Sequence, residues 1–281
     1  MTTAHPLAKD DGYYLVLAPP PISDFAEASL AEAASLLRLK VPELNRILGV
    51  GQPVPLSRVA TSEEAALIGD RLRTLGIESV TVSNEDLHLE VAAKRIRALE
   101  VSGDSLSAFA AGSGEKLAAR WGDVILIVAG RLVLNRVEVE ERKRRGRKQL
   151  VDSRHLSTDE PVLDLYTRSC DVNWRIGASN FDFSCLGSAK AATTFENFAA
   201  LISLLRKRAA DAQFDDSYIL TRPALATVWP VQDQTRKGEW RRSGAGKFEV
   251  ATVTTTDNET QFRRYSRLRH HLKLRELMDG A

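Results

Sequence analysis

The stretch that decides the fold of the first third of the chain runs from Leu37 to Ser83 and reads LRLKVPELNRILGVGQPVPLSRVATSEEAALIGDRLRTLGIESVTVS. Val41-Pro42 predicts the start of a short helix, because proline at the first helical position lacks only a donor that the helix would not use. Thr61 and Glu64 form a capping-box pattern at the start of a longer helix. Gly76 predicts the end of that helix.

Strand patterns flank these helices. The apolar run Tyr13–Ala18 predicts a buried strand that ends at three prolines, and Ile77–Val82 predicts a closing strand. Between them, Ala26 begins a helical apolar stripe and Pro55–Val59 is a short strand. Residues 12–90 are therefore predicted to fold as one compact β-α-α-β-α-β unit that does not share the core of Phe195–Leu205.

The segment Leu37–Ser83 resembles the C-terminal domain of the large-subunit ribosomal stalk protein. The resemblance implies the same small α/β fold, which in that family recruits translational GTPases through a lysine-rich face on its first two helices. Here that face is acidic, so the predicted partner surface is basic, either on another protein or on this chain's own C-terminal part. The predicted partner-binding residues are Asp24, Glu27, Glu32 and Glu43.

Residues 91–220 predict a β-rich domain closed by a helix. The segment Ala119–Val133 (ARWGDVILIVAGRLV) is apolar on both faces at its centre, as in a central strand. Val133–Glu140 then alternates, with charged residues on the wet face. Thr193 with Glu196 is a second capping box, and it begins an amphipathic helix. This order of elements, with the WGDVILIVAG segment, resembles a barrel-like pleckstrin-homology-like domain of the bacterial kind.

Two shorter patterns in this part predict further strands. Leu163–Ile176 alternates as one strand, and Phe181, Phe183 and Cys185 indicate the next. Cys170 and Cys185 are expected to be buried thiols on adjacent strands, because neither has a second ligand at metal-site spacing.

Residues 221–281 predict a basic tail. Arg222–Pro230 is expected to be extended and Gln232–Gly246 to be a polar loop, with a weakly alternating strand at Phe248–Thr255. Asn258 with Gln261 offers a cap for a last helix. His270 and His271 on that helix are expected to be solvated, because neighbours on a helix point in different directions and no third ligand is nearby.

The charge distribution agrees with separate modules in a multidomain α+β protein. Residues 1–94 carry 8 basic and 13 acidic side chains (−5), residues 95–220 carry 19 and 17 (+2), and residues 221–281 carry 12 and 7 (+5). The start of the chain lacks the apolar core of a signal peptide, and no apolar run approaches the ~20 residues of a membrane span. A cytoplasmic protein of bacterial type is expected.

No motif for catalysis occurs in the sequence. Nucleophile elbows, Cys–His signatures and His-Glu-x-x-His are missing, so no catalytic residue, metal, cofactor or small-molecule ligand is predicted. An enzyme with a dispersed site between domains stays open as an alternative.

The strongest anomaly is a run of six basic residues in seven positions: Arg142, Lys143, Arg144, Arg145, Arg147 and Lys148. Such a cluster is either a solvated hairpin tip or a site that attracts phosphates or anionic lipids. The preferred hypothesis for the whole chain is a non-enzymatic adaptor or scaffold with a protein partner. The alternative is a binder of an anionic polymer or of a membrane surface through this cluster.

Overall fold

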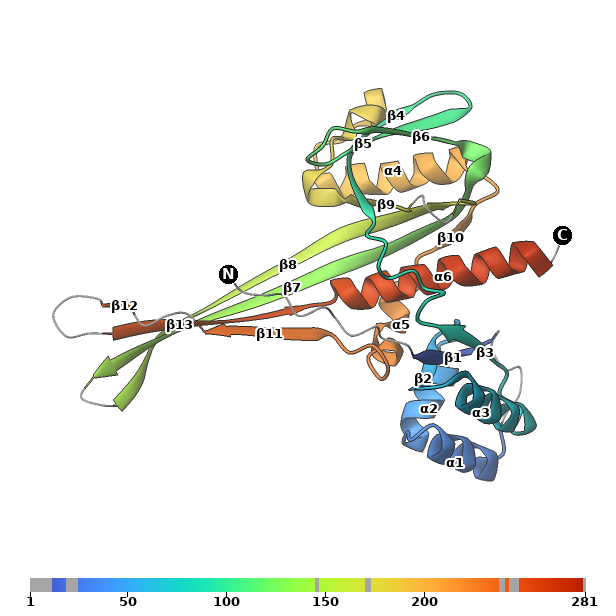
Figure 1. Cartoon of the computed structure of the whole chain (residues 1–281). Coiled ribbons are helices and arrows are strands. Elements are labelled where there is room, and N and C mark those ends of the chain that lie inside the picture. Colours follow the sequence, from blue (N-terminus) through green and yellow to red (C-terminus); the bar gives the residue numbers. More distant parts are fainter. Residues whose placement is uncertain are drawn as a thin grey trace.

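The computed structural model describes residues 12–18, 25–144, 147–169, 173–237, 241–242 and 248–279. The fold is α+β, with a three-stranded and a ten-stranded sheet (Figure 1).

The N-terminal module has the predicted element order β-α-α-β-α-β. Its sheet has the order β2-β1-β3, and β1 pairs antiparallel with both neighbours. The elements are β1 (Tyr13–Leu17), α1 (Glu27–Leu36), α2 (Val41–Leu48), β2 (Pro55–Val59), α3 (Ser62–Thr74) and β3 (Ser79–Ser83).

The local signals in this module act as predicted. At α3, Thr61 Oγ1 accepts a hydrogen bond from the Glu64 amide at 3.1 Å, while the Glu64 carboxylate accepts from the Ala60 amide at 3.3 Å. Gly76 follows α3 with φ +85°, a conformation that favours glycine. On α2 the three apolar residues Leu44, Ile47 and Leu48 are buried.

The large sheet is open and has the order β11-β13-β7-β8-β9-β4-β5-β6. The expected barrel is wrong, because β7 and β8 run straight on for 21 residues each and do not curl back to close the sheet. The strands of its main path are β4 (Lys94–Val101), β5 (Ser105–Ala110), β6 (Lys116–Arg120), β7 (Val124–Arg144), β8 (Arg147–Thr167), β9 (Asn173–Gly177), β11 (Gln232–Lys237) and β13 (Phe248–Asp257). Two short strands lie off that path, β10 (Gln213–Asp215) beside β7 and β12 (Arg241–Arg242) beside β13.

The first part of β7 is buried on both faces, as its apolar run predicts. Ile127 belongs to one hydrophobic core, which contains helix α4 (Thr194–Arg208), while Leu126 and Val128 belong to the other. That second core contains the helices α5 (Tyr218–Leu225) and α6 (Glu259–Asp279). The capping box predicted for α4 is present, with the Thr193 hydroxyl and the Glu196 carboxylate as partners.

Residues 221–281 do not form a separate tail. Within Arg222–Pro230 the chain is helical up to Leu225, with Pro223 inside α5, and Gln232–Lys237 is the strand β11. The strand predicted at Phe248–Thr255 is confirmed as β13, which pairs with β7. The Asn258 side chain accepts from the Val133 amide at 2.7 Å and donates to the Arg131 carbonyl at 2.9 Å, so it ties α6 to β7.

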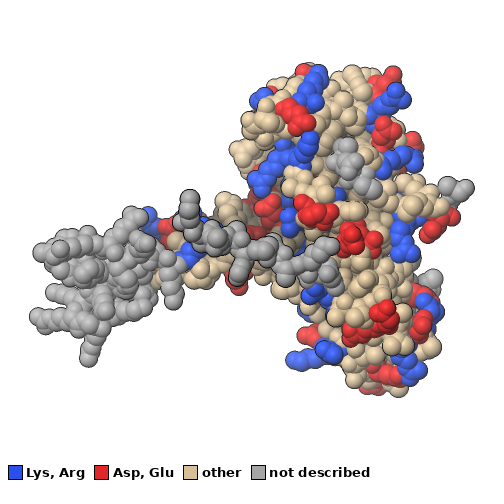
Figure 2. All heavy atoms as spheres, in the orientation of Figure 1, with Lys and Arg blue, Asp and Glu red and all other residues tan. Residues whose placement is uncertain are grey.

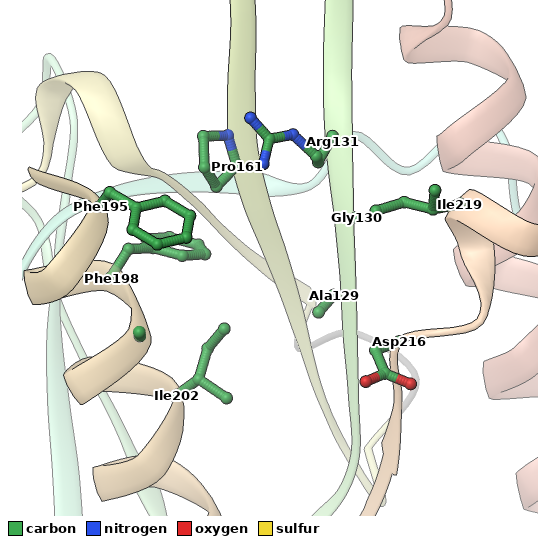
Figure 3. Close-up of a pocket in the computed structure, with 10 residues that line it drawn as sticks. Ala129, Gly130, Arg131, Pro161, Phe195, Phe198, Ile202, Asp216 and Ile219 are labelled. Carbon is green, nitrogen blue, oxygen red and sulfur yellow. The ribbon is translucent and has the colours of Figure 1, made fainter.

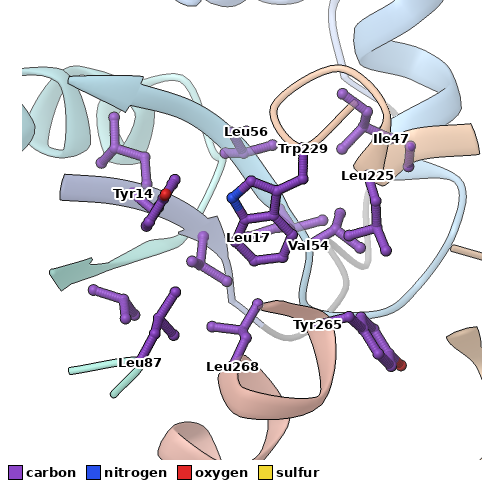
Figure 4. Close-up of a cluster of buried hydrophobic side chains, with 14 of the residues drawn as sticks. Tyr14, Leu17, Ile47, Val54, Leu56, Leu87, Leu225, Trp229, Tyr265 and Leu268 are labelled. Carbon is purple, nitrogen blue, oxygen red and sulfur yellow. The ribbon is translucent and has the colours of Figure 1, made fainter. Parts of the chain in front are cut away.

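The N-terminal module shares its core with the C-terminal segment (Figure 4). Tyr14 and Leu17 of β1 lie with Trp229 and with Tyr265 and Leu268 of α6 in one continuous buried cluster. The rings of Tyr14 and Trp229 meet edge to face, 5.3 Å apart. The core of the module is therefore separate from that of α4, as predicted, but it extends beyond residues 12–90, because α6 and Trp229 cover that module's sheet.

Two local strand predictions also need correction. Leu163–Ile176 is split between β8 and β9, which pair with each other, for example Leu165 with Trp174. Phe183 begins a 3₁₀ helix, Phe183–Ala189, on which Cys185 is half-buried as a free thiol. Cys170 lies outside the described residues.

The outer halves of β7 and β8 form an arm that projects from the body, flanked by β13 and β11 (Figure 1). Along the described side chains of this arm, none from 131 to 139 or from 153 to 160 is fully buried. Over these two ranges the sheet of the arm is therefore exposed on both faces. No helix in the described part of the chain is long and apolar enough to cross a membrane.

Candidate functional site

The far end of the arm brings two basic segments together that are about a hundred residues apart in sequence. Across the sheet, Arg241 pairs with Glu249, which pairs with Arg142. In the next row, Arg242 pairs with Phe248, which pairs with Lys143, and Lys143 pairs with Lys148. Strands two apart lie ~10 Å from each other. The backbone register therefore concentrates cations from two hairpins at one place.

The sequence at the end of the arm is strongly basic. The described backbone positions carry seven basic residues against the two acidic residues Glu141 and Glu249, and Arg145 lies outside the described residues. The body differs, since Figure 2 shows Lys and Arg interspersed with Asp and Glu over the visible face. The basic residues at the arm end are Arg142, Lys143, Arg144, Arg147, Lys148, Arg241 and Arg242.

The acidic face expected on α1 and α2 is partly engaged within the chain. Glu32 pairs with Arg71 of α3, and the Glu43 carboxylate accepts from the Lys40 amide at 2.9 Å at the start of α2. Glu27 is exposed in the first turn of α1. Asp24 lies outside the described residues. Docking of a basic partner on this face stays a prediction.

An apolar groove of about 220 Å³ lies between α4, α5 and the sheet (Figure 3). Phe195, Phe198 and Ile202 line it from α4, and Ile219 lines it from α5. Phe195 is 66% exposed. Asp216 is the carboxylate among its lining residues, and no nucleophile or acid–base pair accompanies it. The lining of the groove is apolar apart from Asp216 and Arg131.

Two sets of buried polar side chains beside α6 are paired, whereas Nε and Nη1 of Arg267 on this helix have no hydrogen-bond partner among the described residues. The Arg175 guanidinium donates two hydrogen bonds to Asp164, at 2.7 and 2.8 Å, and both side chains are buried. Asp215 accepts from the Tyr265 hydroxyl at 2.8 Å and pairs with Arg269 at 2.7 Å. The first pair ties β8 to β9 and the second ties β10 to α6. Arg269 also lines a groove of about 290 Å³ beside the C-terminal part of α6.

His270 is buried, contrary to the expectation of a solvated residue. Its ring stacks on Tyr166 at 4.3 Å, because α6 lies between the large sheet and the N-terminal module. Burial lowers the pKa of His270 to about 4. His271 is half-buried, and burial lowers its pKa as well. Within the described ranges, no group of three or more His, Cys, Asp or Glu residues could hold a metal ion.

Sequence reasoning found the basic run at 142–148 and missed the contribution of Arg241 and Arg242. The signal was present, since residues 236–247 hold five basic residues against one acidic residue. The pairing of β13 with β7 was needed to bring the two runs together. No protein-family model, curated protein or solved structure matches the chain.

Proposed function

We propose that the protein is a non-enzymatic binder of double-stranded nucleic acid and that the end of the β-arm is its binding element. The observation that carries this proposal is the meeting of the two basic segments, 142–148 and 241–242, in adjoining rows of one sheet. Cations gathered in this way neutralise phosphates and release counterions, which supplies sequence-independent affinity.

The polar character of the arm favours a nucleic acid over a membrane surface. At the arm end four strands lie side by side, β12, β13, β7 and β8, and a sheet of this width, about 14 Å at ~4.8 Å between strands, would follow the phosphate backbone. The described part of the arm also presents hydrogen-bonding side chains, among them Asn135, Ser157 and Thr254, and such groups contact phosphates and sugars in protein–DNA interfaces. The alternative ligand for the arm end is an anionic membrane. Adaptor activity through the acidic residues of α1 and α2 is a separate proposal.

The test is fluorescence anisotropy with a labelled DNA duplex at several salt concentrations. The wild type is expected to bind with an affinity that falls steeply with salt. Replacement of Arg142, Lys143, Arg144, Arg147 and Lys148 by Ser is expected to weaken binding at least tenfold at low salt. The slope of log K against log salt is expected to fall by about 0.9 for each phosphate contact that is lost.

A matched control replaces three exposed basic residues at the end of α4, Arg206, Lys207 and Arg208, by Ser. This variant is expected to bind as the wild type does. Because the arm variant removes five charges and the control three, losses in proportion to the charge removed would show that only the net charge matters. Binding to anionic vesicles without binding to DNA would replace the nucleic acid by a membrane.

A further inference from the structure

The outer part of β8 has an open edge. β9 pairs with β8 only from Val162 to Tyr166, so from Arg147 to Pro161 no described strand lies on the side of β8 away from β7. This edge is about 45 Å long at ~3.3 Å per residue. A long unpaired edge presents a row of backbone donors and acceptors, which is a template for another strand.

The charges along this edge are complementary to those of a second copy. Arg147 and Lys148 stand at the arm end, and Asp159 and Glu160 stand near the body. There Asp159 also pairs with Arg131 of β7 at 2.8 Å, and Glu160 accepts from the Ser179 amide at 2.9 Å. Antiparallel pairing of two β8 strands brings the basic end of each alongside the acidic end of the other. Opposite charges in neighbouring positions of two strands stabilise their pairing.

The register is restricted by geometry and charge. The β8 strand of one copy can pair with β8 of the other only as far as Pro161, because β9 occupies the edge from Val162 onward. A two-fold axis through Asp152 or Arg154 would place like charges opposite each other, whereas an axis through Ser153 places Asp152 opposite Arg154 in both halves. β8 has a bulge at Val151 in its pairing with β7. Between this bulge and the arm end, the pairing of the two β8 strands therefore shifts by one residue.

We infer that two copies of this chain pair antiparallel through β8, with Ser153 on the two-fold axis. The product is one continuous sheet with a basic arm end on each side of the axis. The inference is independent of the proposed nucleic-acid binding, since it rests on the edge and not on the affinity of the arm end.

The experiment is a cysteine cross-link in the full chain, with Cys170 and Cys185 replaced by Ser. Opposite residues in an antiparallel pair have Cα atoms ~4.5–5.5 Å apart, which suits a disulfide. Ser153→Cys is expected to give a covalent dimer on mild oxidation. Ser157→Cys, exposed on the same strand, is expected to stay monomeric, because its two copies would be separated by several residues of the partner strand.

Light scattering on the uncross-linked protein supplies a second measurement without nucleic acid. A mass of twice 31.0 kDa is expected at tens of micromolar. Asp159→Lys is expected to weaken the dimer at least fivefold, while the control Asp233→Lys on β11, at the other border of the arm, leaves it unchanged. A monomeric wild type, or cross-linking at position 157 as efficient as at 153, would overturn the inference. The variants keep every basic residue of the arm end, so failure here leaves the DNA-binding result intact.

Discussion

At the scale of single residues, the buried ion pair between Asp164 and Arg175 is the most sensitive point of the large sheet. Asp164 is fully buried and Arg175 is 6% exposed. Asp164→Asn leaves the guanidinium buried with its nearest charge removed. Such a loss is expected to cost about 3–5 kcal/mol of unfolding free energy in urea denaturation.

The matched control for this prediction is the exposed pair of Lys116 and Glu100, which are 57% and 63% exposed. Glu100→Gln is expected to change stability by less than ~1 kcal/mol, because solvent screens exposed pairs. Equal effects of the two substitutions would contradict the structural role given to Asp164.

The buried His270 is expected to make the stability of the protein depend on pH. Its pKa is about 4 in the folded protein and ~6.5 in an unfolded chain. Between these values the unfolded chain binds more protons, so the stabilisation is full above pH ~6.5 and is lost as the pH falls toward 4. His270→Phe, which keeps a ring against Tyr166, is expected to flatten the decline of unfolding free energy between pH 7 and pH 5. An unchanged pH profile would mean that His270 is accessible to water.

At the scale of elements, Gly130 sets the distance between β7 and α6. A Cβ atom added at this position would lie 2.8 Å from Cδ2 of Phe262 and 3.1 Å from the Tyr218 ring. Gly130→Ala is expected to cost about 1–3 kcal/mol in chemical denaturation. The second substitution Phe262→Leu should recover part of that loss, whereas Gly103→Ala, with open space around it, should be neutral.

The arm end gives an element-scale prediction that sequence alone did not suggest. If the two basic segments act as one surface, Arg241→Ser with Arg242→Ser should weaken DNA binding even though the run at 142–148 is intact. A loss of about threefold to tenfold is expected in the anisotropy assay, with a smaller salt slope. Binding equal to the wild type would confine the site to the β7–β8 hairpin.

The elements that the sequence predicted correctly are those with local signals. Thr61, Pro42 and Gly76 act through hydrogen bonds and backbone angles within a few residues, so α2 and α3 could be read from neighbours in sequence. The last helix was also predicted, from Asn258 and Gln261, but its burial was not, because the buried face of α6 includes Gln261, Ser266 and Arg267. These residues are typical of a solvated helix. Their burial depends on partners far away in sequence, such as the Tyr166 hydroxyl, 2.9 Å from Ser266 Oγ.

The candidate site was predictable only in part for the same reason. The basic run at 142–148 is visible as composition, but its position on a long arm requires β7 and β8 to continue past the core. Alternation of Val133–Glu140 correctly indicated a strand and wrongly suggested a buried face. Period-two patterns identify a strand without showing what covers it.

At the scale of the whole molecule, α6 packs between the two sheets, and we expect both sheets to unfold as one cooperative unit. Leu268 is fully buried in the cluster that also contains Tyr14 of β1 and Leu126 of β7. Removing its side chain therefore opens a cavity that borders both sheets. Leu268→Ala is expected to lower the unfolding free energy by about 2–5 kcal/mol.

Hydrogen exchange locates the effect of that substitution. If the core is continuous, the amides of β1 and those of the buried part of β7 should lose protection to the same extent, because both open in one cooperative event. The matched control is Leu201→Ala on α4, which lies in the other core. It should deprotect α4 and its neighbours before it affects β1. Loss of protection in β1 alone after Leu268→Ala would mean that the N-terminal module unfolds independently, and α6 would then be a contact surface between two domains.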